Sequence, residues 1–363
     1  MTTTFMKVAT LTLMSSLLVL PNTQTLAYNN QLKEAKTALE NIAKVDPDKE
    51  LIEMEKASLA NDNLENDFNK LTLEQDNLKI EIDKRTGRIA LDSENQEVPR
   101  IRIPDNQTPI VIEDKLIYTS PLADKVVEPI SGGVRQIVHI KNSSAPKFYD
   151  FPMELEEGQI LTLNEQNGGA NVTNQAGEKV MIIGFPWAKD AEGNDLETYY
   201  EIVDKNTLRQ FIDFNEGTAF PVSADPVLCD GINYNSISYA DWHPVDYYDE
   251  GFKWSLRLVP TACGKRYSRP TPWSSWEDVV NMTPDSEHWD KKYGTDQYWS
   301  MYNQYVCHTD FVPYYNLVMI IPGVDPVAEF IRQNEYDPKK RYHLEPWRKD
   351  KGYLGFMVNL CND

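Results

Sequence analysis

The chain lacks several short motifs that indicate an enzymatic activity. It contains no Gly-x-Ser-x-Gly nucleophile motif, no glycine-rich phosphate-binding loop and no His-x-x-x-His pair. These absences disfavour a common serine hydrolase, a nucleotide-binding loop and a zinc metalloprotease. There is also no Cys-x-x-Cys pair of the kind that holds structural zinc. We therefore expect no metal and no cofactor.

Basic residues are few relative to acidic residues. The 363-residue chain has 36 Lys and Arg against 56 Asp and Glu, a formal net charge of -20. Because nucleic acids and anionic lipid surfaces attract proteins through basic groups, this charge disfavours both as partners. Hydrophobic residues make up 41% of the chain, which at this length is enough for two cores. The composition predicts an acidic, globular, multidomain protein.

Only one apolar run is long enough to raise the question of a membrane segment. It extends from Val8 to Leu20, follows Lys7, and precedes the small-residue site Thr25-Leu26-Ala27. A short membrane anchor is the alternative, but the run falls short of the roughly 20 residues that cross a bilayer. A basic residue, a short apolar run and a small-residue cleavage site, in that order, are typical of a secretory signal peptide, here over residues 1–27. We expect the mature chain to be extracellular, either released or held at the cell wall.

Cysteine is scarce and confined to the last part of the chain. All four cysteines, seven of the eight tryptophans and fourteen of the nineteen tyrosines lie beyond Pro226. This shift predicts a domain boundary near Asp225, with a C-terminal domain over residues 226–363. In an exported domain the cysteines are expected to form two disulfides. We favour Cys229–Cys263 and Cys307–Cys361, which join neighbours along the chain, although sequence leaves the other pairings open.

The N-terminal part of the mature chain has helical periodicity. Apolar residues recur at helical spacing from Gln31 to Val45, and Asp46-Pro47 ends the pattern. A second helix is expected from Asp48 to about Leu71. Residues 28–76 are thus interpreted as an acidic helical segment or linker to the wall. A partner-joining coiled coil is the alternative, but it has too few heptads.

Alternating apolar residues replace the helical period after Asn77. Leu78 to Leu91 has the pattern of a β-hairpin with a turn at Lys84-Arg85-Thr86-Gly87. Residues 77–225 are therefore expected to form an antiparallel β domain, either a sandwich or barrel-like. Its one histidine, His139, is expected to be a hydrogen-bonded structural residue. The further strand candidates are Ile110–Ile112, Lys115–Thr119, Val134–Ile140, Lys147–Leu155, Gln159–Leu163 and Lys179–Ile183. The fold class is mostly β or α+β, with N-terminal helices and a C-terminal α+β domain that is rich in aromatic residues.

Residues between Pro186 and Pro226 occur in a characteristic order. They are Pro186-Trp187-Ala188, Asp190-Ala191, Gly193, Thr198, Tyr200-Glu201 and Phe220-Pro221-Val222-Ser223-Ala224-Asp225-Pro226. This stretch resembles an upstream module of many exported proteins of Gram-positive bacteria, especially actinobacteria. In those proteins the module precedes varied C-terminal domains.

A second characteristic set of residues lies in the C-terminal part, bracketed by cysteines. It comprises Ser255-Leu256, Val259-Pro260-Thr261, Trp276-Glu277, Gln304, Cys307-His308, Leu344-Glu345-Pro346-Trp347-Arg348 and Cys361-Asn362. This part resembles domain of unknown function 2599, a secreted family, and the resemblance implies export without naming an activity. The chain departs from the family pattern at His343, where asparagine usually stands, and at Asp363, where proline is frequent.

The sharpest site hypothesis joins His308, Glu345 and Arg348. A bridge from Cys307 to Cys361 would bring His308 near Glu345, which together could act as a general acid/base pair beside the arginine. In the alternative interpretation His308 packs on aromatic residues and Glu345 pairs with Arg348 in a turn salt bridge. The candidate binding residues are Trp347, Gln304, Trp276 and Glu277. A sugar or cation site is also conceivable where Asp241, Asp246, Asp249 and Glu250 lie among Trp242, Tyr247 and Tyr248, although a polar loop capped by aromatics explains the same residues.

Two functions from different classes fit these observations. The first is a secreted effector, a hydrolase or toxin-like protein, whose C-terminal domain carries the activity. The second is a non-catalytic binding module for a cell-envelope polymer or an extracellular protein. The resemblance to carrier modules favours the first, and the missing catalytic motif favours the second.

Overall fold

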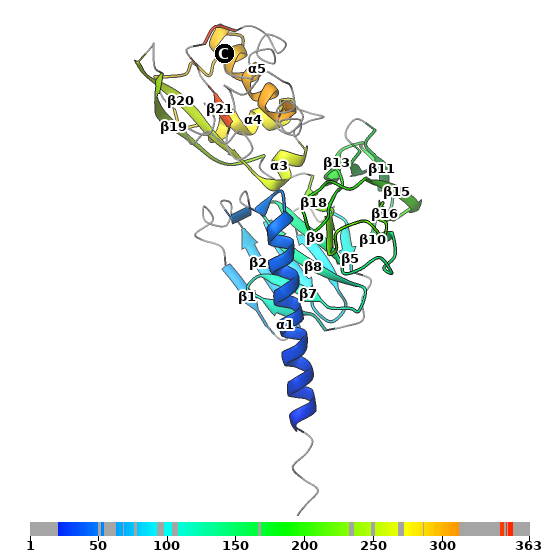
Figure 1. The fold of residues 1–363 in the computed structure, drawn as a ribbon. Helices are drawn as coiled ribbons and strands as arrows, with labels where there is room; N and C mark the ends of the chain where they lie inside the picture. Colours follow the sequence, from blue (N-terminus) through cyan, green and yellow to red (C-terminus); the bar gives the residue numbers. More distant parts are fainter. Residues whose placement is uncertain are drawn as a thin grey trace, which may run out of the picture.

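The computed structural model describes residues 21–49, 52–53, 63–67, 69–75, 78–92, 98–103, 108–165, 168–231, 236–247, 251–267, 272–285, 287–311, 342–344, 346 and 348–350. Within them, two large antiparallel sheets form a β-sandwich, and a smaller α+β part follows (Figure 1). The expected strand-rich fold class is confirmed. None of the helices in these ranges combines the length and the apolar character that crossing a membrane requires.

The first sheet of the sandwich contains eight strands. In spatial order they are β1 (Asn63–Asn66), β2 (Lys70–Gln75), β3 (Leu78–Asp83), β4 (Arg88–Asp92), β5 (Arg100–Arg102), β10 (Phe148–Glu154), β16 (Thr207–Ile212) and β15 (Thr198–Asp204). β3 and β4 form the expected hairpin, paired from Lys79 with Asp92 to Asp83 with Arg88. Burial alternates along β10, so one face of this sheet points inward and the other outward.

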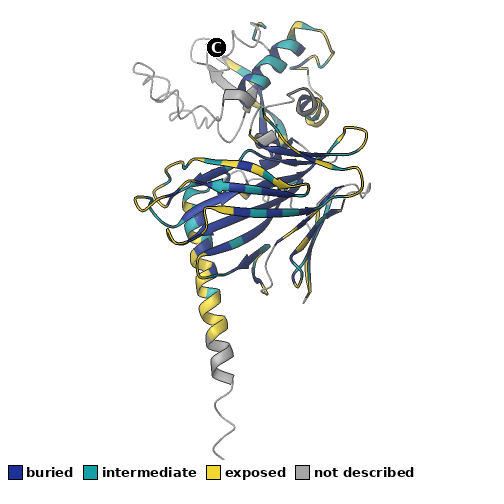
Figure 2. Ribbon diagram, turned by 90° about the vertical axis from the view of Figure 1, so that its right-hand side faces the viewer, coloured by how far each residue is buried: buried dark blue, intermediate teal, exposed yellow. Residues whose placement is uncertain are grey.

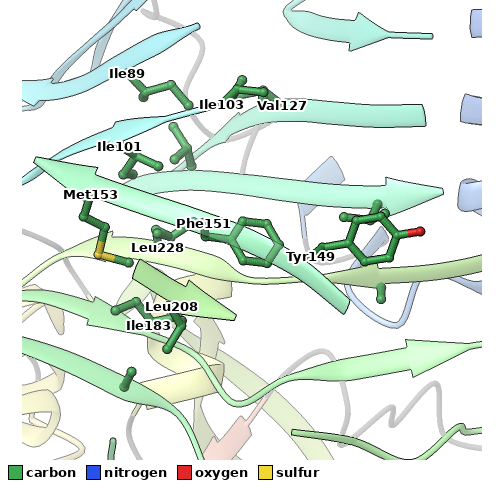
Figure 3. Packing of buried hydrophobic residues seen from close by; sticks show 14 of the residues in the cluster. Ile89, Ile101, Ile103, Val127, Tyr149, Phe151, Met153, Ile183, Leu208 and Leu228 are labelled. Atoms are coloured by element: carbon green, nitrogen blue, oxygen red, sulfur yellow. The ribbon is translucent and has the colours of Figure 1, made fainter. Parts of the chain in front are cut away.

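The second sheet contains ten strands. Its main path is β11 (Ile160–Leu163), β12 (Ala170–Thr173), β13 (Lys179–Ile183), β18 (Val227–Asp230), β9 (Gly133–Ile140), β8 (Ala123–Ile130), β7 (Lys115–Tyr118) and β6 (Ile110–Ile112), and β17 (Val222–Asp225) pairs with both β9 and β14 (Trp187–Lys189). Residues of both sheets share one core, in which Ile89 and Ile101 of the first lie near Val127 and Leu228 of the second (Figure 3). Of the two expected forms, sandwich and barrel-like, the β domain therefore adopts the sandwich.

The N-terminal helix covers the outer face of the second sheet. α1 (Pro21–Val45) buries Ala35 and Ile42 against Ile117 and Ile137, while residues 27–31, nearer its N-terminus, are exposed (Figure 2). β9 is consequently buried along its whole length, since the core lies on one side and α1 on the other. The expected helix end at Val45 is confirmed. Residues 21–27 of the predicted leader belong to the same helix, and residues 1–20 lie outside the described ranges.

The prediction of a second helix over residues 48–71 is wrong from Asn63 onward. β1 and β2 occupy that stretch and pair with each other, and Leu71 and Leu73 enter the sandwich core. The sequence Lys70-Leu-Thr-Leu-Glu-Gln75 alternates with period two, a strand signal that the preceding acidic residues obscured. Residues 28–76 therefore include parts of the sandwich and its covering helix, and not only a spacer.

A buried arginine fastens the end of α1 to the sheet. The guanidinium of Arg135 donates to both carboxylate oxygens of Asp46 at 2.7 Å and to Glu128 at 2.6 Å. Arg135 is 2% exposed. Burial lowers the pKa of Arg135, but the carboxylates of Asp46 and Glu128 outweigh this effect and raise it. The buried charge of Arg135 therefore fixes the position of Asp46, and with it the path of the chain after α1.

The C-terminal part begins later than expected. The boundary predicted at Asp225–Pro226 falls between β17 and β18, two strands of the same sheet. After β18, a hairpin of β19 (Ile237–Tyr247) and β20 (Gly251–Pro260) pairs with β21 (Tyr342–Leu344). The described residues of this part also include the helices α3 (Ala262–Tyr267), α4 (Pro272–Met282) and α5 (Asp296–Phe311).

One disulfide connects the sandwich with the C-terminal part. Cys229 of β18 is bonded to Cys263 of α3, with Cα atoms 5.9 Å apart, which confirms the first expected pairing. Both cysteines belong to a small buried cluster with Val227 and Val259. Cys307 is also disulfide-bonded, whereas the position of Cys361 lies outside the described ranges.

Replacing Arg135 by methionine is expected to lower the free energy of unfolding by about 3–5 kcal/mol, because the buried Asp46 carboxylate would lose its cation and Glu128 would keep only Lys115 as a cationic partner. Urea denaturation followed by circular dichroism measures this change. The control is Arg88→Met, which removes a surface pair with Glu154 and should cost at most about 1 kcal/mol. Equal losses in the two variants would contradict the buried clamp.

The double substitution Cys229→Ser and Cys263→Ser is expected to lower stability by about 2–4 kcal/mol, since the unfolded chain loses a covalent constraint. Chemical denaturation in non-reducing buffer measures the loss. An unchanged denaturation midpoint would show that this bridge contributes nothing to folding.

Candidate functional site

Three polar residues lie on one face of α5. Two of them, Gln304 and His308, are candidate site residues from the sequence analysis, and the third is Ser300. Ser300, Gln304 and His308 are four residues apart, so they line one stripe of the helix, and each is at most 2% exposed. Gln304 Nε2 donates to Ser300 Oγ at 3.1 Å, and Ser300 Oγ donates to the backbone carbonyl of Arg348 at 2.9 Å. The stripe therefore ties α5 to the segment that follows β21.

A further side-chain contact supports this structural role. Asn303 Nδ2 donates to Asp350 Oδ1 at 3.0 Å, one turn along from the Ser300 contact. Arg348 is half-buried, and the described hydrogen bond uses its backbone and not its guanidinium. Glu345 and Trp347, the other members of the hypothesis, lie outside the described ranges. The proposed His308–Glu345 pair thus stays a prediction, and the burial of His308 argues for the alternative in which it packs.

The remaining candidate binding residues face different ways. Trp276 is fully buried on α4, whereas the neighbouring Glu277 is exposed. Consecutive residues of a helix point in directions about 100° apart, so these two do not share one site.

Trp276 is the centre of an aromatic core. Its ring contacts are Trp289, Tyr298, Tyr302 and Tyr305, with centroids 5.5–5.8 Å away. Trp276 and Gln304 are therefore core residues in this structure.

A different group of aromatic residues lies on and beside the β19–β20 hairpin, where Phe252 and Trp254 are exposed and the other two members are half-buried. We call Trp242, Phe252, Trp254 and His288 the aromatic platform. Along β20, alternate residues share a face, and Leu256 continues the line of Phe252 and Trp254 into the buried core. Trp254 is 42% exposed and Phe252 is 77% exposed. The apolar face of the hairpin thus extends past the core that covers its base.

Three rings of the platform, those of Trp242, Trp254 and His288, are held by contacts with one another. The imidazole of His288 stacks on Trp254 with centroids 4.7 Å apart and an interplanar angle of 14°. The same imidazole meets Trp242 edge to face at 5.4 Å. Trp242 Nε1 donates to the carbonyl of Pro284 at 3.2 Å, which fixes the second indole. The platform is therefore an ordered surface whose indoles have defined orientations.

The opposite face of the hairpin is polar and internally paired. Arg257 Nε donates to Asp241 Oδ1 at 2.7 Å, and the guanidinium lies over the ring of Tyr239 at 5.8 Å. These partners raise the pKa of Arg257, chiefly through the hydrogen bond with Asp241. The two faces of the hairpin thus differ. On one face Arg257 and Asp241 pair with each other, and on the other face aromatic rings are exposed to solvent.

The sequence hypothesis found only part of this site. It selected Trp242 and Asp241, which lie on opposite faces, and missed Phe252, Trp254 and His288. The side chains of Asp246, Tyr247, Tyr248, Asp249 and Glu250 lie outside the described ranges. The alternation Phe252-Lys-Trp254-Ser-Leu256 was the available signal for a shared face, but no sequence signal places His288 against it.

Exposed aromatic rings of this kind recognise flat apolar surfaces. A ring face attracts the C–H groups of sugars, other rings or cations, and exposed apolar patches mark interaction sites. Comparisons of the chain with protein-family models, with curated proteins and with solved structures find no significant match. The resemblance to domain of unknown function 2599 therefore stays a prediction.

Replacing Ser300 by alanine is expected to lower the free energy of unfolding by about 1–3 kcal/mol, because Gln304 Nε2 loses its acceptor and the Arg348 carbonyl loses its donor. Thermal unfolding measures the change. Glu277→Gln on the exposed side of α4 serves as the control and should stay within about 0.5 kcal/mol of the wild type. A Ser300→Ala variant as stable as that control would contradict the structural role of the stripe.

Proposed function

We propose that this protein is an exported binding module whose aromatic platform stacks on the sugar rings of an uncharged extracellular polysaccharide. The observation that carries the proposal is the uncovered face of the β19–β20 hairpin, where Trp254 is stacked on His288 and still 42% exposed. Export is supported by the predicted leader and by the disulfide Cys229–Cys263, since disulfides persist in oxidising compartments.

The size of the platform favours a glycan over a protein partner. A stable protein interface buries about 800 Å² on each partner. The exposed rings of the platform, Phe252 and Trp254, offer much less than this, but each can stack on a single sugar unit. The net charge of -20 favours an uncharged polymer, because an acidic polymer would be repelled.

The effector alternative has weaker support from the geometry. The histidine that was to act as general base is 2% exposed and lies on a helix stripe whose other members form structural hydrogen bonds. A general base must reach the proton that it removes in a bound substrate. The binding function is therefore the one that the described residues support best.

The substitutions Trp254→Ala and Phe252→Ala, made singly, are each expected to weaken polysaccharide binding about ten-fold, because each removes one stacking surface worth about 0.5–1.5 kcal/mol in addition to its apolar area. Depletion assays on purified cell walls and on insoluble neutral glycans measure binding. Tyr239→Ala is the matched control, since Tyr239 is also 42% exposed but lies on the opposite face of the hairpin.

Two results would contradict the proposed function. The first is equal loss of binding in the Tyr239→Ala control and the platform variants. The second is hydrolysis of a wall polymer by the wild type that His308→Gln abolishes while the fold is retained, which would favour the effector.

A further inference from the structure

A second group of exposed aromatic residues lies on the sandwich, on the outer face of the first sheet. The strands β10, β16 and β15 are neighbours at one end of this sheet (Figure 1). Phe148 of β10 is directly opposite Phe211 of β16, which is directly opposite Tyr199 of β15. The residues that alternate with them, including Tyr149 and Tyr200, enter the core between the sheets, so this set points outward. We call Phe148, Phe211 and Tyr199 the aromatic row.

The ring of Tyr199 has one face available for a ligand. The rings of Tyr199 and Phe211 stack with centroids 5.1 Å apart and an interplanar angle of 28°, so Phe211 covers the face of Tyr199 that is turned toward β16. In the part of the chain that the structure describes, β15 is the last strand of the first sheet, and no strand of this sheet covers the other face. Tyr199 is accordingly 42% exposed.

Charged residues form a second row beside the aromatic row, two residues along each strand. Asp150 is directly opposite Arg209, which is directly opposite Glu201. The guanidinium of Arg209 donates to the two carboxylate oxygens of Asp150 at 2.6 and 3.0 Å and lies over the ring of Phe148 at 4.1 Å. Glu201 is exposed, and its carboxylate accepts no hydrogen bond from the described residues. The end of the row on β15 therefore combines a ring face with an available acceptor.

A ring face beside an available carboxylate fits a sugar unit. The C–H groups of a sugar pack on the ring, and the sugar hydroxyls donate to the carboxylate. A cation uses the same two groups, but the positive charge of Arg209 directly across from Glu201 would repel it. The two charges do interact, since the pKa of Arg209 is raised by its hydrogen bond with Asp150 and also by the charge of Glu201. An uncharged hydroxyl does not meet this repulsion.

We propose that the aromatic row is a second carbohydrate-binding site, where a neutral sugar unit stacks on the available face of Tyr199 and donates a hydrogen bond to Glu201. The inference rests on the proposed function for its ligand class and adds that the chain holds the polysaccharide at two places, one on the sandwich and one on the C-terminal part. The exposed rings of Phe148 and Tyr199 offer much less than the about 800 Å² that a stable protein interface buries on each partner, which disfavours a protein here.

Isothermal titration calorimetry of the full mature chain with short neutral glycans measures the number of sites. The probes are cellotetraose, laminaritetraose, mannotetraose and tetra-N-acetylchitotetraose. The expected result is two sites per chain for at least one probe, with Tyr199→Ala and Trp254→Ala each leaving one site and the double variant leaving none. Tyr239→Ala is the matched control, since Tyr239 is likewise 42% exposed, and this variant should keep both sites.

Two substitutions of Glu201 distinguish a sugar from a cation. In the Trp254→Ala background, where only the aromatic row remains, Glu201→Ala removes the acceptor and is expected to weaken tetrasaccharide binding about ten-fold. Glu201→Gln keeps an acceptor oxygen without its charge, so a sugar should still bind within about three-fold of the parent. Tetramethylammonium, which has a charge and no hydroxyl, should not displace the tetrasaccharide. If Tyr199→Ala fails to fold, the exposed substitution Glu201→Ala decides whether the row binds.

Each contrary result has a distinct meaning. A single site that Trp254→Ala abolishes and Tyr199→Ala leaves intact would overturn the inference while the proposed function stands. A single site abolished only by Tyr199→Ala would support the aromatic row and contradict the platform. Displacement by tetramethylammonium, or equal losses in Glu201→Ala and Glu201→Gln, would overturn the sugar assignment in favour of a cation. Absence of saturable binding for all four probes would contradict both sites.

Discussion

The buried charge of Arg135 is the constraint on which the arrangement of the N-terminal half depends. A guanidinium near the start of β9 needs carboxylates on several sides, and it obtains them from Asp46 after α1, from Glu128 on β8 and, at 3.9 Å, from Asp225 on β17. These three residues are distant in sequence. Their convergence fixes the end of α1 and the neighbours of β9 at the same time, so helix and sheet form one body.

The same helix borders a cavity of about 410 Å³ above the second sheet. Because Asp46 is clamped at one end, the preceding turns of α1 must lie over the second sheet, where Ala35 and Ile42 find apolar partners. Beneath the part of α1 that is nearer its N-terminus, the sheet has the polar residues Asp124, His139 and Lys141. The helix crosses above these polar groups, and the cavity lies between them and α1.

Aromatic residues have two distinct uses in the C-terminal part. Around Trp276 they fill a core in which indole and phenol rings pack together. On the hairpin, the same kinds of residue continue beyond that core into water and form the platform. The difference arises from length, since β19 and β20 extend farther than the helices that cover their base. Composition alone does not distinguish these uses.

The sequence by itself determined the local and covalent features of the described chain. Helical spacing predicted the end of α1 at Val45, and strand patterns predicted β3, β4, β6, β7, β9, β10, β11 and β13. The sequence favoured the pairing Cys229–Cys263 among several, and the structure confirms it. These depend on neighbours in the chain, which a pattern can record. Only the tertiary structure decided that His308 and Trp276 are buried, that His288 stacks on Trp254, and that Asp124, His139 and Ser223 form one row under α1. Such pairings join residues far apart in sequence, and burial depends on which surfaces meet when the chain folds.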